Sequence, residues 1–405
     1  MGSIAHYREV LKTQLFEGAR VLREYVRQED LAAAMATAGC SWRERLWPPV
    51  QTIWTFLVQV VHPGWPCRAA VAEVLAEQAA AGIPVKASAD PSAYCQARQH
   101  VPLSVYVQAL RTVGQTFQTK VGDAYRWCDR RVWVVDGSSC SMPDMPELQE
   151  AFGQPDGQKK GCGFPVARLV AMFCWASGAV LGVAVGPYRS NELSLWRQLW
   201  DQLQAGDVIV GDRFYGAYAD LAQLVARSCD GLFRLRGARA RTLDLRKGKR
   251  LGKEDRLVVW SRSTPCPRTL SAKEFTSLPA TITVRVLRFH TRVKGFRSHT
   301  ILVVTTLLDA VQYPAEQIAA LYGERWTVEL RIREVKTTLQ MEVLRGKGED
   351  IVRKEIVMHF LAYNLIRAVM WQAAQEHGRP LHRLSFAGTM ERFHIMAPYL
   401  CLFRG

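Results

Sequence analysis

The chain has 405 residues, 48% of them hydrophobic, which is enough for two or three domains with substantial cores. Its net charge of +16 favours a polyanionic partner, most simply nucleic acid. The ten cysteines form no C-x-x-C pair and no paired Cys/His spacing, which disfavours a zinc site and is typical of reduced thiols in a cytoplasmic protein.

The first third of the chain is predicted to be helical. Apolar residues recur at intervals of three and four in 11–26, 31–38 and 50–61, and a further helix is expected from Leu103 to about Trp127. The first 30 positions are repeatedly charged and do not resemble a signal peptide. The basic edges of this helical region are compatible with DNA binding and equally with a plain scaffold.

An uncharged run over 169–186 approaches the length of a membrane span. The turn-forming sequence Ala176-Ser177-Gly178 divides it into two short runs rich in Val, Phe, Trp and Leu. Two buried strands joined by a turn are therefore predicted, rather than a membrane helix.

Two aspartates follow short apolar runs, in Val132-Trp-Val-Val-Asp136 and in Asp207-Val-Ile-Val-Gly-Asp212. Uninterrupted apolar runs are typical of central strands covered on both faces, and we expect a helix over 192–203 between them. Ligands of α/β sheets bind at the carboxyl ends of such strands. A single Asp there is often only a turn or cap residue, but two of them indicate a site.

Basic residues are concentrated between Arg227 and Arg297, where 19 Lys and Arg stand against 5 Asp and Glu, a net charge of +14. Sequence patterns in this part of the chain predict strands at 231–236, 281–289 and 300–306, with a turn at 293–297. A basic β-rich lobe suits contact with a phosphate backbone. The alternative is a solvated surface.

Four polar side chains with helical spacing follow Pro314. At roughly 100° per residue, Tyr322, Arg325, Glu329 and Lys336 fall within about 60° of one another on a helix. Such a stripe is ordinarily a solvated face with i,i+4 ion pairs.

The neighbouring residues favour a packed helix instead, because the rest of its surface is largely apolar. These neighbours are Trp326, Leu330, Ile332, Val335 and Leu339. A partly buried stripe of mixed charge needs a partner, and a divalent metal with a phosphodiester would satisfy the carboxylate and the cations together. Three carboxylates from three elements can hold two divalent cations about 3.5–4 Å apart for in-line attack on a phosphodiester.

The spacing Tyr322-x2-Arg325-x3-Glu329-x6-Lys336 resembles the Tyr-Arg-Glu-Lys signature of bacterial insertion-sequence transposases of the IS-four type. The Asp-Gly-Ser around Asp136 and the Asp-Arg-x-Tyr around Asp212 resemble the first and second catalytic Asp regions of that family. The resemblance covers nearly the whole chain, from the Gly39-Cys-x-x-Arg43 region to Ser385-Phe-x-Gly388.

The resemblance implies an α/β fold with a ribonuclease-H-like catalytic domain, interrupted by a β-rich insertion and preceded by an all-helical domain. The expected boundaries are 1–127 for the helical, DNA-end-binding domain, 128–236 plus 307–378 for the catalytic domain, 237–306 for the insertion and 379–405 for the C-terminal segment. The chain stops soon after Ser385-Phe-x-Gly388, where relatives often continue, which leaves open whether a C-terminal dimerisation segment is missing.

The resemblance also implies the chemistry. Asp136, Asp212 and Glu329 would form a catalytic triad that binds two Mg²⁺ ions, with Mn²⁺ as a substitute. In this family activated water nicks the transposon end, and the released 3′-hydroxyl then attacks again, often through a hairpin, and joins target DNA in a cut-and-paste reaction. The implied partners are double-stranded terminal inverted repeats, target DNA and a second copy of the chain, at the bacterial nucleoid in the cytoplasm and without a membrane.

The expected DNA contacts fall into two groups. Tyr322, Arg325 and Lys336 would hold phosphates near the scissile bond. Further contacts are expected from basic residues elsewhere in the chain: Arg213, Lys159, Lys160, Arg246, Lys247, Lys249 and Arg250.

Two other functions remain open at this point. A structure-selective nuclease with the same fold would cut DNA without joining it. A DNA-binding regulator derived from a transposase would do neither, and the complete triad argues against it.

The basic cluster of the insertion gives the first testable prediction. If Arg246, Lys247, Lys249 and Arg250 contact DNA phosphates, replacing all four should reduce the slope of log affinity against log salt concentration by up to about 0.9 per lost contact. Fluorescence anisotropy with a duplex at several salt concentrations measures this slope. An unchanged slope would mean that the cluster is only solvated surface.

Overall fold

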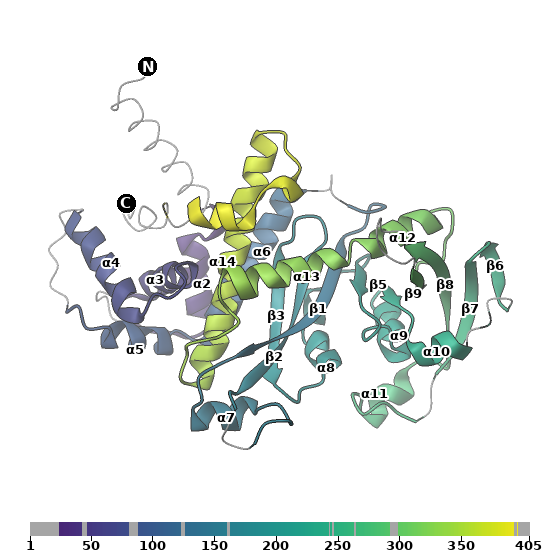
Figure 1. Cartoon of the computed structure of the whole chain (residues 1–405), viewed down its shortest axis with the longest axis horizontal. Coiled ribbons are helices and arrows are strands. Elements are labelled where there is room, and N and C mark those ends of the chain that lie inside the picture. Colours follow the sequence, from purple (N-terminus) through teal and green to yellow (C-terminus); the bar gives the residue numbers. More distant parts are fainter. Residues whose placement is uncertain are drawn as a thin grey trace.

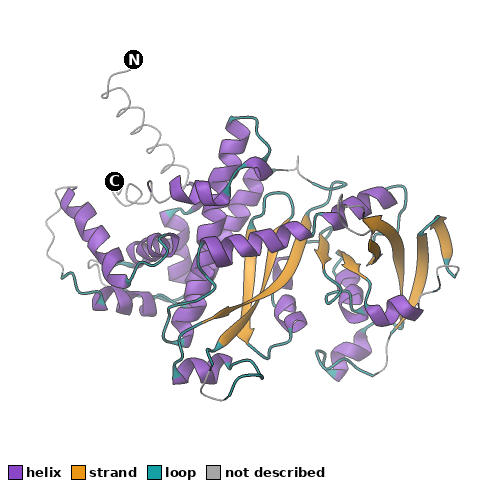
Figure 2. Ribbon diagram, in the orientation of Figure 1, coloured by secondary structure: helices purple, strands orange, loops and turns teal. Residues whose placement is uncertain are grey.

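The computed structural model is an elongated α/β molecule (Figure 1). Helices lie at one end, a sheet crosses the middle, and a strand-rich segment lies at the other end (Figure 2). The structure describes residues 24–42, 47–80, 88–122, 126–159, 163–242, 244, 247–262, 265–291, 299–392 and 395.

The described part of the N-terminal region is helical, as predicted. Its helices are α2 (Gln28–Thr37), α3 (Pro49–Val61), α4 (Cys67–Ala80), α5 (Ser92–His100) and α6 (Leu103–Val121). Helix α6 ends before the predicted Trp127, because Gly122 has a φ of 68°, which interrupts the right-handed helix. The helix predicted over 11–26 lies almost entirely outside the described residues.

The uncharged run forms two strands, β2 (Val166–Cys174) and β3 (Val180–Pro187). Gly178 has a φ of 80° in the turn between them, a conformation that glycine adopts without strain. The prediction of two buried strands is confirmed. None of the described helices combines the length and the apolar character needed to cross a membrane.

One nine-stranded sheet contains all the described strands between Val132 and Thr305, in the order β3-β2-β1-β4-β5-β9-β8-β7-β6. The other strands are β1 (Val132–Ser141), β4 (Val208–Gly211), β5 (Asp230–Arg234), β6 (Lys249–Gly252), β7 (Asp255–Ser261), β8 (Thr281–Thr291) and β9 (His299–Thr305). Strands β1, β4 and β5 run parallel, and the remaining pairs are antiparallel. The strands predicted near 231–236, 281–289 and 300–306 are therefore present, whereas the predicted turn at 293–297 lies outside the described residues.

Helices cover both faces of the β1–β3 part of the sheet. Leu181 contacts Gly114 of α6, whereas the next residue, Gly182, faces Leu199 beyond α8 (Glu192–Arg197). On the α6 side, Phe173 of β2 packs edge to face on two aromatic rings of the long helix α14 (Glu349–Glu376). The fully buried run Val132–Val135 fits a strand enclosed on both faces.

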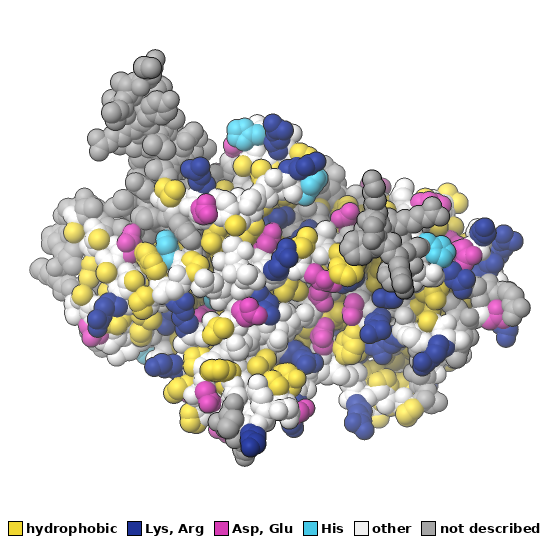
Figure 3. Space-filling view, viewed as in Figure 1, with side chains coloured by type: hydrophobic (Ala, Val, Ile, Leu, Met, Phe, Trp, Pro, Cys, Tyr) yellow, Lys and Arg dark blue, Asp and Glu magenta, His cyan; other side chains and the backbone are white. Residues whose placement is uncertain are grey.

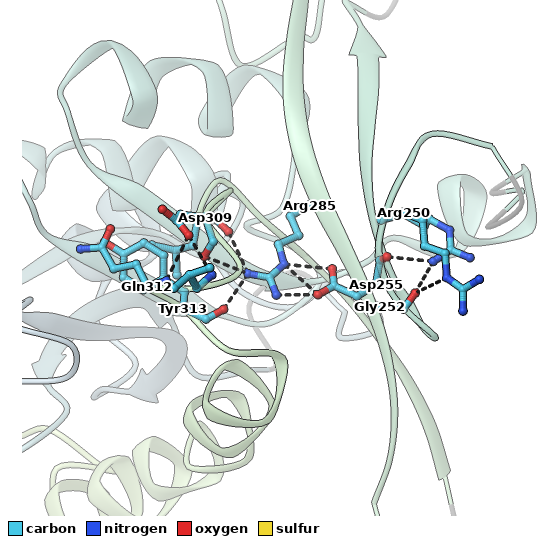
Figure 4. Close-up of polar contacts among 10 residues, drawn as sticks. Arg250, Gly252, Asp255, Arg285, Asp309, Gln312 and Tyr313 are labelled. Atoms are coloured by element: carbon cyan, nitrogen blue, oxygen red, sulfur yellow. Dashed lines mark hydrogen bonds and ion pairs between the residues drawn. The ribbon is translucent and has the colours of Figure 1, made fainter.

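The insertion is fastened to the body by a buried guanidinium (Figure 4). Arg285 of β8 is fully buried and donates to both carboxylate oxygens of Asp255 on β7, at 2.9 Å from Nε and 2.5 Å from Nη2. Its Nη1 donates to the carbonyl of Tyr313 at 2.7 Å and to that of Asp309 at 3.3 Å. These carbonyls belong to the segment that leads into α12 (Ala315–Gly323), so one side chain links two insertion strands to that helix.

This arrangement makes Asp255 a stability determinant. Asp255→Ala should lower the free energy of unfolding by about 3–5 kcal/mol, because it leaves the Arg285 charge buried without its carboxylate. Denaturant unfolding of the full chain measures the change. The matched control is Arg288→Ala on the same strand, whose ion pair with Glu254 is partly exposed at 3.5 Å and should contribute less than about 1 kcal/mol. Equal effects of the two variants would contradict the anchoring role.

Candidate active site

The structure places Asp136 inside strand β1 rather than at its end. The prediction that the strand ends at this Asp is wrong, because β1 continues to Ser141 along the antiparallel partner β2. The parallel ladder with β4, however, covers only Val132–Val134. Asp136 therefore lies in the part of β1 that no longer pairs with β4. Its side chain is on the same face as Val134, whose cross-strand partner Phe173 packs on α14.

Asp212 follows the last residue of β4, as predicted. Its carboxylate accepts a hydrogen bond from the backbone N–H of Phe214 at 2.6 Å, which fixes the turn that leaves the strand. Because β1 and β4 are adjacent and parallel, the two aspartates lie at the same edge of the sheet.

The carboxylate of Asp136 lies in a partly buried and mainly acidic setting. Burial raises its pKa to about 6, and the charges of Asp212 and Glu192 also raise it. The backbone N–H of Gly137 and the guanidinium of Arg325 lower it. A buried carboxylate next to further carboxylates favours a cation or a proton.

The segment after Pro314 is helical, as predicted, but it is divided into pieces. Helix α12 is followed by α13 (Trp326–Arg333), which packs against β1, and then by a π-helical turn, Glu334–Thr338. Arg325 lies at the junction of α12 and α13, with 11% of its side chain exposed, and donates to Glu329 at 3.1 Å. Its guanidinium thus binds the Glu329 carboxylate and is close enough to Asp136 to lower the pKa of that carboxyl.

The other two signature residues differ in environment. Tyr322 is buried and packs edge to face on Phe289 of β8 at 6.2 Å, and this burial raises the pKa of its hydroxyl. Lys336 lies in the π-helical turn, 3.7 Å from Glu342. Such turns are frequent at functional sites. The four side chains are therefore not equally exposed members of one stripe.

The prediction that the remaining face of this helix is packed is wrong for two residues. Trp326 is 63% exposed and Leu330 is 50% exposed, whereas Ile332, Val335 and Leu339 are buried. Helix α13 lies along the surface of the sheet (Figure 1), and its outer side carries the exposed pair.

Sequence reasoning missed a further carboxylate, Glu192, at the start of α8. It accepts a hydrogen bond from the hydroxyl of Tyr215 at 2.5 Å. A Cβ on Gly137 would overlap with its carboxylate, so only glycine at this position leaves room for it beside Asp136. Glu192 lies 55 positions after its neighbour Gly137, in a helix predicted only for its apolar residues. The Asp-Gly pair at 136–137 was the one local signal of a close approach.

The predicted basic contacts lie in two places. Arg213 is exposed directly after Asp212, and Lys159 is exposed in the loop after α7 (Pro146–Phe152). Lys247, Lys249 and Arg250 are exposed on or beside β6, the outermost strand, far from β1 in the sheet order. Lys160 and Arg246 lie outside the described residues. On the visible face, acidic side chains gather where α12 meets α13, with Lys and Arg side chains around them (Figure 3).

The donor atoms near Asp136 suit a hard divalent cation. Asp136 and Asp212 supply carboxylate oxygens, which are the ligands that Mg²⁺ prefers. Within the described ranges, no three His, Cys, Asp or Glu side chains are already grouped closely enough to hold a metal. Glu329 is bound to Arg325, so it would have to exchange this partner to join the other two.

Comparison with known proteins agrees with this geometry. The model of the family described as "Transposase DDE domain" matches residues 127–365, more than half of the chain. The chain belongs to this family. Transposase InsG of insertion sequence element IS4 from Escherichia coli is 29% identical over 73% of the chain and 65% of its own length. A probable transposase of element IS5377 from Geobacillus stearothermophilus is 38% identical over 23% of each chain. The resemblance to IS-four-type transposases is confirmed.

A comparison with solved structures covers more of the chain than the family model does. A piggyBac transposase, solved by cryo-EM as a synaptic complex with hairpin DNA, matches 95% of the chain and 80% of its own length with a TM-score of 0.50 and 8% identity. At this identity the match concerns the fold alone, and it confirms the α/β class of this member of the transposase DDE family. The chain spans less than two thirds of the length of InsG.

The pKa of Asp136 gives a prediction with a definite sign. Because the folded protein raises this pKa from 3.8 to about 6, ionisation of Asp136 opposes folding progressively between about pH 4 and pH 6. Asp136→Asn should therefore be more stable than the wild type at pH 7 in metal-free buffer, and this advantage should vanish below about pH 4. Denaturant unfolding of both proteins across this pH range measures it. A stability difference that is the same at all pH values would contradict the assignment.

Proposed function

We propose that the chain is a DNA transposase that cleaves transposon ends and joins the resulting 3′-hydroxyl to target DNA. The observation that carries this proposal is the juxtaposition of Asp136 and Asp212 at one edge of the sheet with Arg325 facing them. Carboxylates and a guanidinium in one place suit a phosphodiester, since the cation-binding and anion-binding groups are both present.

The proposed triad is Asp136, Asp212 and Glu329, as ligands of two Mg²⁺ ions. Bound ions would activate the attacking oxygen and stabilise the leaving oxygen of an in-line displacement. The hydrogen bond from Arg325 to Glu329 supports an additional role for Arg325. A DNA phosphate that bound this guanidinium would replace Glu329 as its partner and free that carboxylate for a metal ion. Tyr322 and Lys336 would contact phosphates on the same side, the former from its buried position against β8.

The finer architecture is also part of the proposal. The helical region 1–127 would bind the terminal repeats, and the basic insertion 237–306 would hold flanking DNA. The ribonuclease-H-like part would comprise 128–236 and 307–378. Support comes from the strand arrangement, in which three antiparallel strands continue into the parallel strands β4 and β5. A homodimer on DNA, at the nucleoid, completes the proposal.

Incubating the full chain with Mg²⁺ and duplex DNA from the flanks of its own gene tests the proposal. We expect nicked and joined products from the wild type. Asp136→Asn and Asp212→Asn should abolish cleavage while leaving DNA binding nearly unchanged, because each removes a metal ligand but little positive surface. Glu329→Gln should fold and lose nicking by orders of magnitude.

The control is Asp201→Asn, a carboxylate that is 53% exposed and pairs with Arg111 rather than with the site. It should cut normally. Arg325→Ala and Lys336→Ala should weaken binding to transposon ends as well as cleavage. Cutting without joining would indicate a nuclease, and binding without cutting would indicate a regulator. Nicking by Glu329→Gln at the wild-type rate would end the triad proposal.

A further inference from the structure

A cavity of about 340 Å³ opens beside the segment that follows Asp212, on the side of the sheet that α8 covers. Its walls come from the start of α8, the segment after Asp212, helix α9 (Tyr218–Ala226), the connection from β5 to α10 (Gly237–Thr242), and residues 267–269 of the insertion. The cavity therefore borders both the body of the protein and the insertion.

Four arginines and one aspartate supply the charge of this cavity: Arg197, Arg236, Arg239, Arg268 and Asp220. Arg197 and Asp220 already neutralise each other, since Nε and Nη2 of Arg197 donate to one carboxylate oxygen at 2.8 and 2.6 Å. Asp220 is fully buried, so its carboxylate is covered rather than presented to a ligand. The remaining charged groups of the walls are positive.

Arg236 and Arg239 are close to each other and partly withdrawn from water. Burial lowers the pKa of both guanidiniums, and the charge of Arg236 lowers that of Arg239 further. Two carboxylates act in the opposite direction and raise the pKa of Arg236. One is Asp220, which is bound to Arg197, and the other is Asp212, which is a proposed metal ligand. Two neighbouring guanidiniums that are withdrawn from water repel each other, and an anion close to both would reduce this repulsion.

The cavity adjoins the turn that follows Asp212, one of the proposed metal ligands. Arg236 donates from Nε to the carbonyl of Arg213 at 3.2 Å and from Nη2 to the carbonyl of Phe214, the two residues that follow Asp212. An anion at Arg236 would thus lie next to the turn that follows Asp212. Arg325 reaches the same site from α13, on the opposite face of the sheet.

We propose that this cavity binds a phosphodiester group of the DNA strand that passes Asp212, with Arg236 and Arg239 as its direct ligands. The inference rests on the proposed function, since it takes DNA as the substrate. The strand would then be held on both faces of the sheet edge, by Arg325 on one side and by Arg236 and Arg239 on the other. Because residues 267–269 close the cavity, the bound phosphate would also fix the insertion against the body.

The experiment pairs protein variants with DNA that lacks one charge. Binding of the full chain to a flanking duplex is measured by anisotropy in EDTA, with a neutral methylphosphonate placed at each linkage around the cleavage site in turn. Arg239→Gln is the main variant, because the side chain of Arg239 contacts Trp260 and Ser261 rather than the Asp212 turn. Arg236→Gln and the Lys variants at both positions accompany it, and exposed Arg379→Gln after α14 is the control.

At one linkage we expect the methylphosphonate to weaken DNA binding by the wild type several-fold. The same methylphosphonate should not weaken DNA binding by Arg239→Gln any further, because the variant already lacks the contact. That variant should also lose up to about 0.9 of the salt slope, and Lys should restore it. Equal sensitivity of wild type and Arg239→Gln at every linkage would overturn the inference. A second result would also overturn it: inorganic phosphate binds at these arginines, but the effect of Arg239→Gln depends on no single DNA linkage. The cavity would then bind a free anion and not the DNA backbone. Wild-type cleavage in Mg²⁺ tests the proposed function separately, because the binding measurement involves no metal.

Discussion

The short parallel contact between β1 and β4 is the constraint on which the site depends. Three residues of β1, Val132–Val134, pair with β4, and after them β1 continues alone on that edge. A longer ladder would close the sheet at Asp136. The register brings the two aspartates together, because Asp136 is two residues beyond Val134 and Asp212 is two residues beyond its partner Val210. The open edge admits Arg325 from one face and Glu192 from the other, so charged groups from four elements meet there.

The strands of the predicted insertion continue the sheet that carries Asp136 and Asp212 and do not form a separate sheet. Strand β9 pairs with β5 through Leu232↔Thr305 and its neighbours, and β8, β7 and β6 follow in order. Arg285 adds a buried connection to the segment that leads into α12. DNA held by the insertion would therefore be positioned against Asp212 and α13 by a continuous hydrogen-bonded framework, without a flexible joint in the described strands.

Charge is distributed around the site in pairs that DNA could rearrange. Arg325 donates a hydrogen bond to Glu329 and lowers the pKa of Asp136, and Glu192 accepts a hydrogen bond from the hydroxyl of Tyr215. Burial is the main reason for the raised pKa of Asp136, and the charges of Asp212 and Glu192 raise it further. A divalent cation would lower this pKa, and a phosphate would offer Arg325 a second partner.

The sequence alone determined the elements and the chemical types of the site. Apolar runs located β1 to β5, turn residues separated β2 from β3, and the spacing from Tyr322 to Lys336 identified the family. These features are local, because period and turn chemistry act over a few residues. What only the tertiary structure decided depends on contacts between distant residues. The register that leaves Asp136 inside β1, the exposure of Trp326, the place of Glu192 beneath Gly137 and the burial of Arg285 all follow from how strands pair and helices pack, which no local pattern of side chains records.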